Sequence, residues 1–243
     1  MTFFRYRITL FDPLYYAREG LFGAYTPQVL HGTAVNHAIT ASLGLHPERQ
    51  PYVIAETNGG MDVPRYADSR ASRRFYFTPA AVEGPSGDWS EIAKGDNDGF
   101  AFRVEAGEIL KATQLHFLPP ETRFVGLALA KDGMRAFPER IRLGSFRGLA
   151  RLEIEEAASS ELIAGPAPVD HPVDPLVSKA VRGVALNLFP YPLVQNAVCS
   201  KVYELKFERT RLGSEKVARL AWPEGYPERS PEERVPRGPT AII

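Results

Sequence analysis

The chain has 243 residues and a formal net charge of +0, with 29 Lys and Arg residues against 29 Asp and Glu residues. This length suits one large domain or two small ones, and no apolar run is long enough to span a membrane. The single cysteine, Cys199, excludes a disulfide framework within the chain and predicts a reducing, cytoplasmic setting. The net charge of zero counts against a nucleic-acid-binding protein. However, 22 of the 29 basic residues are Arg, whose planar guanidinium group suits phosphates.

Alternating apolar and polar residues in some segments, and apolar or aromatic runs between turn signals in others, predict several strands. In the first, Tyr6, Ile8 and Leu10 alternate with Arg and Thr, and Asp12-Pro13 ends the pattern because Pro has no N–H for the ladder. The other predicted strands cover residues 73–78, 100–104, 122–130, 149–155 and 199–207.

A helix is predicted after the first strand. Thr26-Pro27 supplies a cap and a first helical residue, and Gly44 supplies a C-terminal stop. Gly32 disfavours the interior of this helix, so a later start with Thr33 as the cap is the alternative.

The rest of the chain contains a second helix start signal, a Pro-rich tail and a middle region rich in turns. Asp174-Pro175 predicts a short helix over residues 174–182, and the Pro-rich tail over residues 222–243 is predicted to be extended alone. Residues 56–118 contain too many turn signals for a simple connector. This order of elements favours an α+β fold with a ferredoxin-like (RRM-like) core, a long inserted β-hairpin region at roughly residues 56–118 and an extended C-terminal tail. A β-rich sandwich is the alternative.

Catalytic patterns are sparse. The five histidines lack metal-ligand spacing, and no nucleophile elbow, P-loop or dinucleotide fingerprint occurs, so neither a metal nor a cofactor is predicted. Cys199 lies in an apolar stretch and is predicted to be a buried, inert thiol. A ribonuclease-like group such as His116 with Lys111 and Tyr76 stays open, because no spacing selects it.

Basic residues gather in two places. Residues 135–151 carry five Arg against Glu139 alone, and residues 65–74 carry four Arg beside three aromatic residues. Arg interleaved with aromatic rings suits single-stranded nucleic acid, because Arg contacts phosphate and rings stack bases. Within the first group, the glycines of residues 142–148 would let backbone N–H groups approach an anion. A strand with solvated Arg on its outer face, reached through a tight turn, is the competing interpretation of both features.

Several short segments, taken in order, are similar to one protein family. They are Tyr6-x-Ile8-x-Leu10-x-Asp12-Pro13-Leu14-Tyr15-Tyr16-Ala17-Arg18-Glu19, Tyr25-Thr26, Asn36-His37-Ala38-Ile39, Leu43-Gly44-Leu45, Tyr76-x-Thr78-Pro79, Ile141-Arg142-Leu143-Gly144 and Pro190-x-Pro192-Leu193-Val194-Gln195-Asn196-Ala197. Spread over about residues 5–205, they resemble the "Cas five"-type subunit of type I-D CRISPR interference (Cascade) complexes, a repeat-associated mysterious protein (RAMP).

The resemblance implies a single RAMP domain over residues 1–221, with a ferredoxin-like core and a thumb-like insertion at roughly residues 56–118. It implies a non-catalytic subunit of an RNA-guided DNA surveillance complex that serves antiviral defence. Such a subunit binds the 5′ handle of the CRISPR RNA and bridges the backbone (Cas seven-like) subunits to the large Cas ten-like subunit. Its place is near the PAM end, where target DNA enters, and no membrane is involved.

The predicted RNA contacts combine this resemblance with the basic groups. They are Tyr15, Tyr16, Arg18, Arg73, Arg74, Arg140, Arg142, Gly144, Ser145 and Arg147. For the two tyrosines, core packing behind the first strand is the alternative. Two other functions also stay open: a RAMP endoribonuclease that processes CRISPR repeat RNA, and a protein-interaction module without RNA contact.

Overall fold

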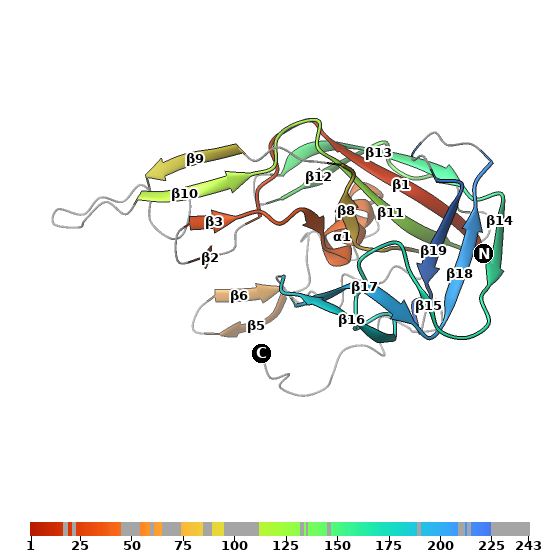
Figure 1. The fold of residues 1–243 in the computed structure, drawn as a ribbon. Helices are drawn as coiled ribbons and strands as arrows, with labels where there is room; N and C mark the ends of the chain where they lie inside the picture. Colours follow the sequence, from red (N-terminus) through yellow and green to blue (C-terminus); the bar gives the residue numbers. More distant parts are fainter. Residues whose placement is uncertain are drawn as a thin grey trace, which may run out of the picture.

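The computed structural model describes residues 1–16, 19–20, 23–44, 54–58, 61–64, 74–84, 89–94, 112–131, 134, 136–144, 147–188, 191–208, 212 and 215–224. These residues form many strands and one helix (Figure 1). No helix in this part of the chain is long and apolar enough to cross a membrane.

The largest sheet is antiparallel and has seven strands. Its order is β12-β13-β1-β11-β8-β4, and β7 also pairs with β11. The strands are β1 (Thr2–Leu10), β4 (Val29–Leu30), β7 (Phe75–Phe77), β8 (Ala80–Val82), β11 (Arg123–Ala130), β12 (Arg140–Leu143) and β13 (Gly148–Glu156). Figure 1 shows β1 between β13 and β11 in this curled sheet. The strands predicted at the start of the chain and at residues 73–78, 122–130 and 149–155 are therefore confirmed.

Strand β1 is covered on both faces. Tyr6, Ile8 and Leu10 are buried in the main core, which helix α1 shares with the sheet. On the other face, Phe3 belongs to a second hydrophobic cluster, and the Arg5 guanidinium lies 4.2 Å from the centroid of the Phe207 ring. Alternation predicts a half-buried strand, but a second layer covers the polar side as well, and Arg5 is only 3% exposed.

Helix α1 (Gly32–Ser42) packs on the main-core face of the sheet. His31 caps it, because its Nδ1 accepts a hydrogen bond from the Thr33 N–H at 3.2 Å. The helix thus begins later than Thr26-Pro27, close to the Thr33 alternative. Its predicted stop is confirmed, since Gly44 has a φ of 65°, which favours glycine.

The Asn36 side chain hydrogen-bonds α1 to the edge of β7 that does not face β11. Its side-chain Nδ2 donates to the Phe77 carbonyl at 2.7 Å, and its Oδ1 accepts from the Phe77 N–H at 2.9 Å. β7 pairs with β11 along its other edge. The fully buried Asn36 amide therefore takes the place of a neighbouring strand and satisfies backbone groups that would otherwise be unpaired.

Four smaller sheets surround the main one. One has the order β2-β3-β10-β9, one β14-β18-β19, one β15-β17-β16, and one is the pair β5-β6. Their strands are β2 (Glu19–Gly20), β3 (Gly23–Tyr25), β5 (Ile54–Asn58), β6 (Met61–Pro64), β9 (Trp89–Lys94), β10 (Ala112–Phe117), β14 (Ser159–Leu162), β15 (Ala167–Pro168), β16 (Ala180–Leu186), β17 (Leu193–Cys199), β18 (Val202–Lys206) and β19 (Val217–Ala221). In Figure 1 the β9–β10 hairpin extends beyond one end of the main sheet.

One predicted element is wrong. The helix predicted over residues 174–182 is a single turn, in which the Val177 and Ser178 N–H groups donate to the Asp174 carbonyl. It goes no further because the chain from Ala180 onward pairs with β17 as strand β16. The strand predicted over residues 199–207 is confirmed as β18 (Val202–Lys206), which begins three residues later than predicted because Cys199 still belongs to β17.

The described structure is mostly β with one helix, so the α+β expectation is met only in part. Within the predicted insertion, β7 and β8 belong to the main sheet, whereas β5–β6 and β9–β10 do not. The strand predicted at residues 100–104 and the tail beyond Glu224 lie outside the described residues. The limits of the insertion and the division into domains stay predictions.

Replacing Asn36 with Ala tests the link between α1 and β7. The change leaves the N–H and C=O of Phe77 buried without their partner, and each such group costs about 1–3 kcal/mol. We expect the free energy of unfolding, measured in urea, to fall by about 3 kcal/mol. The control is Thr40→Ala, which removes a hydrogen bond to the Asn36 carbonyl within the same helix and should cost about 1 kcal/mol or less. Equal losses from the two changes would contradict the link.

Candidate nucleic-acid interface

A tight turn joins β12 to β13 at one end of the main sheet; we call residues 142–148 the glycine turn. Gly144 has a φ of 75°, which favours glycine. The Arg147 N–H donates to the Gly144 carbonyl at 3.1 Å. The Arg142 Nη1 donates to the Arg147 carbonyl at 3.0 Å, so this side chain ties the two arms of the turn together.

The glycine turn lies against the chain that follows β1. A Cβ atom at Gly144 would lie 2.7 Å from the Tyr15 carbonyl oxygen and 2.9 Å from Leu14 Cδ1, both too close for a side chain. On the far arm, the Leu149 N–H donates to Asp12 Oδ2 at 2.7 Å. The glycine therefore has a packing role: it lets the turn touch the backbone of the segment 12–16.

The two tyrosines of this segment are largely buried. Tyr15 is 8% exposed, and its ring packs against Phe117 with centroids 5.2 Å apart. Tyr16 packs against the main core, and its backbone N–H donates to Thr26 Oγ1 at 3.1 Å. Burial raises the pKa of both tyrosines, and the nearby Gly144 backbone offsets part of the rise for Tyr16. Base stacking on these rings stays a prediction, and their burial favours a positioning role for them.

The arginines beside the turn are exposed on the outer face of the sheet. Ile141 and Leu143 of β12 point into the main core, so the alternate residues Arg140 and Arg142 point away from it. In the β12–β13 register Arg140 lies opposite Arg151, and both are exposed. Exposed guanidinium groups are the side chains best suited to bind phosphate oxygens.

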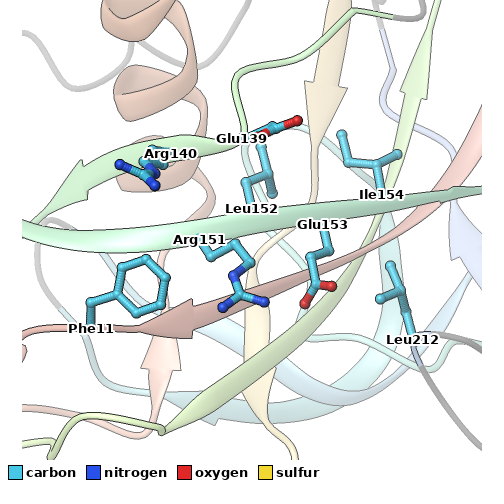
Figure 2. Close-up of a pocket in the computed structure, with 8 residues that line it drawn as sticks. All are labelled: Phe11, Glu139, Arg140, Arg151, Leu152, Glu153, Ile154 and Leu212. Carbon is cyan, nitrogen blue, oxygen red and sulfur yellow. The ribbon is translucent and has the colours of Figure 1, made fainter.

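A hollow of about 470 Å³ opens where β12 begins at Arg140 and β13 extends past it (Figure 2). The Arg151 guanidinium lies 5.2 Å from the centroid of the Phe11 ring at its margin. The hollow is lined by Phe11, Glu139, Arg140, Arg151, Leu152, Glu153, Ile154 and Leu212. Its mixture of basic and acidic residues gives it no single charge.

Six of the predicted contact residues come together at this end of the sheet. They are Tyr15, Tyr16, Arg140, Arg142, Gly144 and Arg147. Arg74 does not join them: it precedes β7, which pairs with the Ala130 end of β11, about 25 Å along the sheet from the turn. Arg18, Arg73 and Ser145 lie outside the described residues.

Sequence reasoning missed two residues of the outer face. Phe11 contacts Arg151, and Arg123 is exposed at the start of β11. The signal that could have found Arg123 is alternation, since Phe124 points into the main core and its neighbour must point out. The pairing of β11 with β1, which brings Arg123 near the turn, is not visible in a single sequence.

A partly buried polar group at the start of α1 was also missed. The Tyr191 hydroxyl donates to Asp174 Oδ2 at 2.7 Å, and the Tyr191 ring meets the edge of the His31 ring at a centroid distance of 4.5 Å. Because His31 caps α1, this group joins the helix to the segment before β17. Its members engage one another, which favours a structural role.

The described residues offer little for catalysis. Within them, no group of three or more His, Cys, Asp or Glu residues could hold a metal. Cys199 is buried, as predicted, and burial raises its pKa to about 11, which disfavours the reactive thiolate. Tyr76 is buried in the second hydrophobic cluster, and Lys111 lies outside the described residues, so the ribonuclease-like group as a whole stays untested.

This fold and site define a β-rich protein with an arginine-lined surface at one end of an antiparallel sheet. The model of one family, Type I-D CRISPR-associated protein Cas5/Csc1, matches residues 1–220. The match covers most of the chain, so the chain belongs to this family of CRISPR-associated proteins. The resemblance seen in the sequence is therefore confirmed. No curated protein matches the chain.

Substituting Gly144 with Ala tests its contact with Tyr15. The matched control is Gly165→Ala: both glycines have positive φ, 75° and 83°, but a Cβ at Gly165 meets nothing within 4 Å. Both changes incur a backbone cost of about 1–2 kcal/mol. Only Gly144→Ala must also push the Tyr15 backbone aside, so we expect it to lose about 1–3 kcal/mol more in urea unfolding. Matching losses would show that the turn does not press on the segment 12–16.

Proposed function

We propose that this protein is a non-catalytic subunit of a type I-D CRISPR RNA-guided DNA surveillance complex and binds the 5′ handle of the CRISPR RNA. In the complex it bridges the Cas seven-like backbone subunits to the Cas ten-like large subunit near the PAM end, where target DNA enters. A ferredoxin-like core with an inserted thumb belongs to the same proposal. Membership of the type I-D Cas5/Csc1 family supports this role.

One observation carries the RNA-binding part of the proposal. The exposed guanidinium groups of Arg140, Arg142 and Arg147 surround a turn whose position is set by direct packing against Leu14 and Tyr15. Charged groups whose backbone is already positioned lose less conformational entropy when they bind phosphate. RNA recognition in single-stranded segments uses such fixed phosphate contacts together with base contacts.

The neutral net charge agrees with this arrangement. Binding to phosphate depends on the local density of basic groups near the strand, because exposed charges more than a Debye length apart are largely screened at physiological salt. Acidic residues that lie more than a Debye length from the RNA site do not oppose RNA binding, and they can face partner proteins. Net charge therefore says little about a subunit that contacts RNA at one end only.

The double variant Arg142→Gln with Arg147→Gln tests the turn as a phosphate site. Each lost phosphate contact lowers the slope of log K against log salt by about 0.7 for a single strand. We expect the slope for a repeat-derived RNA, measured by fluorescence anisotropy on the full chain, to become shallower by about 1.4. Affinity at fixed low salt should fall with it.

Two matched variants control this experiment. Arg142→Lys with Arg147→Lys keeps both charges and should retain most of the slope, because the slope depends on the number of phosphate charges neutralised. Arg182→Gln with Lys206→Gln removes two exposed charges from other sheets and should leave the slope unchanged. An unchanged slope in the Arg142/Arg147 variant refutes the turn as an RNA site.

A cleavage assay tests the non-catalytic part of the proposal. The purified protein, incubated with CRISPR repeat RNA, is expected to leave the RNA intact on a denaturing gel. The informative variant is His116→Ala, since His116 is partly exposed on β10 and belongs to the ribonuclease-like group considered above. Site-specific cleavage that this variant abolishes would make the protein a processing endoribonuclease instead.

A further inference from the structure

Three arginines form a row across the outer face of the main sheet. In the strand registers Arg140 lies opposite Arg151, Arg151 lies opposite Thr9, and Thr9 lies opposite Arg123. Residues directly opposite one another project from the same face. The row therefore crosses four strands, β12, β13, β1 and β11, and spans three strand spacings, about 14 Å.

The row is open to an approaching anion. Arg140, Arg151 and Arg123 are all exposed. Across the described part of the chain neither Arg140 nor Arg123 forms an ion pair, and the Arg151 guanidinium lies near the Phe11 ring (Figure 2). A guanidinium beside an aromatic ring is a pairing that stacks bases as well as binding phosphate.

Acidic side chains flank the row. Glu139 precedes Arg140 and lines the same hollow, and at the other end the Glu83 N–H donates to the Arg123 carbonyl at 2.8 Å. Going along β13 away from the glycine turn, the next outward residue is Glu153, which lies opposite Arg7. Arg7 is itself engaged, since its Nη2 lies 3.0 Å from a carboxylate oxygen of Glu83. Along β13 and β1 the outward side chains therefore change from Arg151 near the glycine turn to the Glu153 carboxylate and the ion-paired Arg7 in the middle of the sheet.

We propose that this arginine row binds the sugar–phosphate backbone of single-stranded RNA that continues from the glycine turn across β12, β13, β1 and β11. The inference rests on the proposed function and extends it. It adds Arg151 and Arg123 to the residues that contact RNA, and it gives the path of the RNA across the sheet. A row of like charges with a stacked ring matches an extended polyanion with bases better than it matches a protein segment. The row also joins the turn directly, through Arg140 and Arg142 on the same strand.

The test compares two double variants of the full chain on the same repeat-derived RNA. The row variant is Arg151→Gln with Arg123→Gln, and the turn variant is Arg142→Gln with Arg147→Gln. If the row contacts two phosphates, the row variant makes the salt slope shallower by about 1.4. Combining both pairs makes it shallower by about 2.8.

Two variants control this comparison. The charge-keeping variant Arg151→Lys with Arg123→Lys should restore most of the slope, whereas Arg182→Gln with Lys206→Gln should leave it unchanged.

The outcomes separate the two proposals. A wild-type slope in the row variant with a shallower slope in the turn variant overturns the row and leaves the proposed function standing. A shallower slope in the row variant alone supports the row and rejects the turn as the handle site. Unchanged slopes in both variants overturn both. If the row variant binds RNA normally but no longer copurifies with the other subunits of the complex, the face docks a protein and the inference is wrong.

Discussion

The approach of Gly144 to the Tyr15 carbonyl sets the geometry of the whole basic end of the molecule. A side chain at Gly144 would not fit there, so the turn and the segment after β1 lie in direct contact. This contact determines where the β12 arginines stand relative to the first strand. A turn held only at its own ends would leave those charges free to move, and each bound phosphate would then cost more entropy.

The two faces of β1 explain why the basic surface lies where it does. One face supports the main core with α1, and part of the other face is covered by the cluster that contains Phe207 and Leu220. Toward Leu10 the outward arginines of the neighbouring strands, Arg151 and Arg123, are exposed, whereas Arg5 farther along β1 is buried. The proposed RNA contact therefore lies at this end of the sheet.

The strongly periodic parts of the chain could be predicted from the sequence. Alternation identified β1 and β13, and high apolar content identified β11, which is buried on both faces. The helix predicted at Asp174 failed because its start signal is satisfied by one turn, after which pairing with β17 overrides local preference. The start of α1 was missed since His31, which is not among the preferred capping residues, caps it.

The site was only partly predictable, because some of its residues come together through contacts between distant parts of the chain. Composition and spacing pointed to the arginines of β12 and to the glycine turn, since both lie close together in the chain. Arg123 and Phe11 reach the same surface only through pairing of β1 with β11 and through the end of β1, and those long-range contacts leave no local signal. The tyrosines were identified by resemblance, but their burial against Phe117 and the main core could be seen only in the fold.

Photo-crosslinking of the assembled complex tests the central claim most directly. The CRISPR RNA would carry 4-thiouridine at successive positions of the 5′ handle, and crosslinked peptides would be mapped by mass spectrometry. RNA binding at the basic end predicts crosslinks to peptides that contain residues 12–16 and residues 140–151. Crosslinks confined to the β15-β17-β16 sheet, or none to this subunit from any handle position, would contradict it.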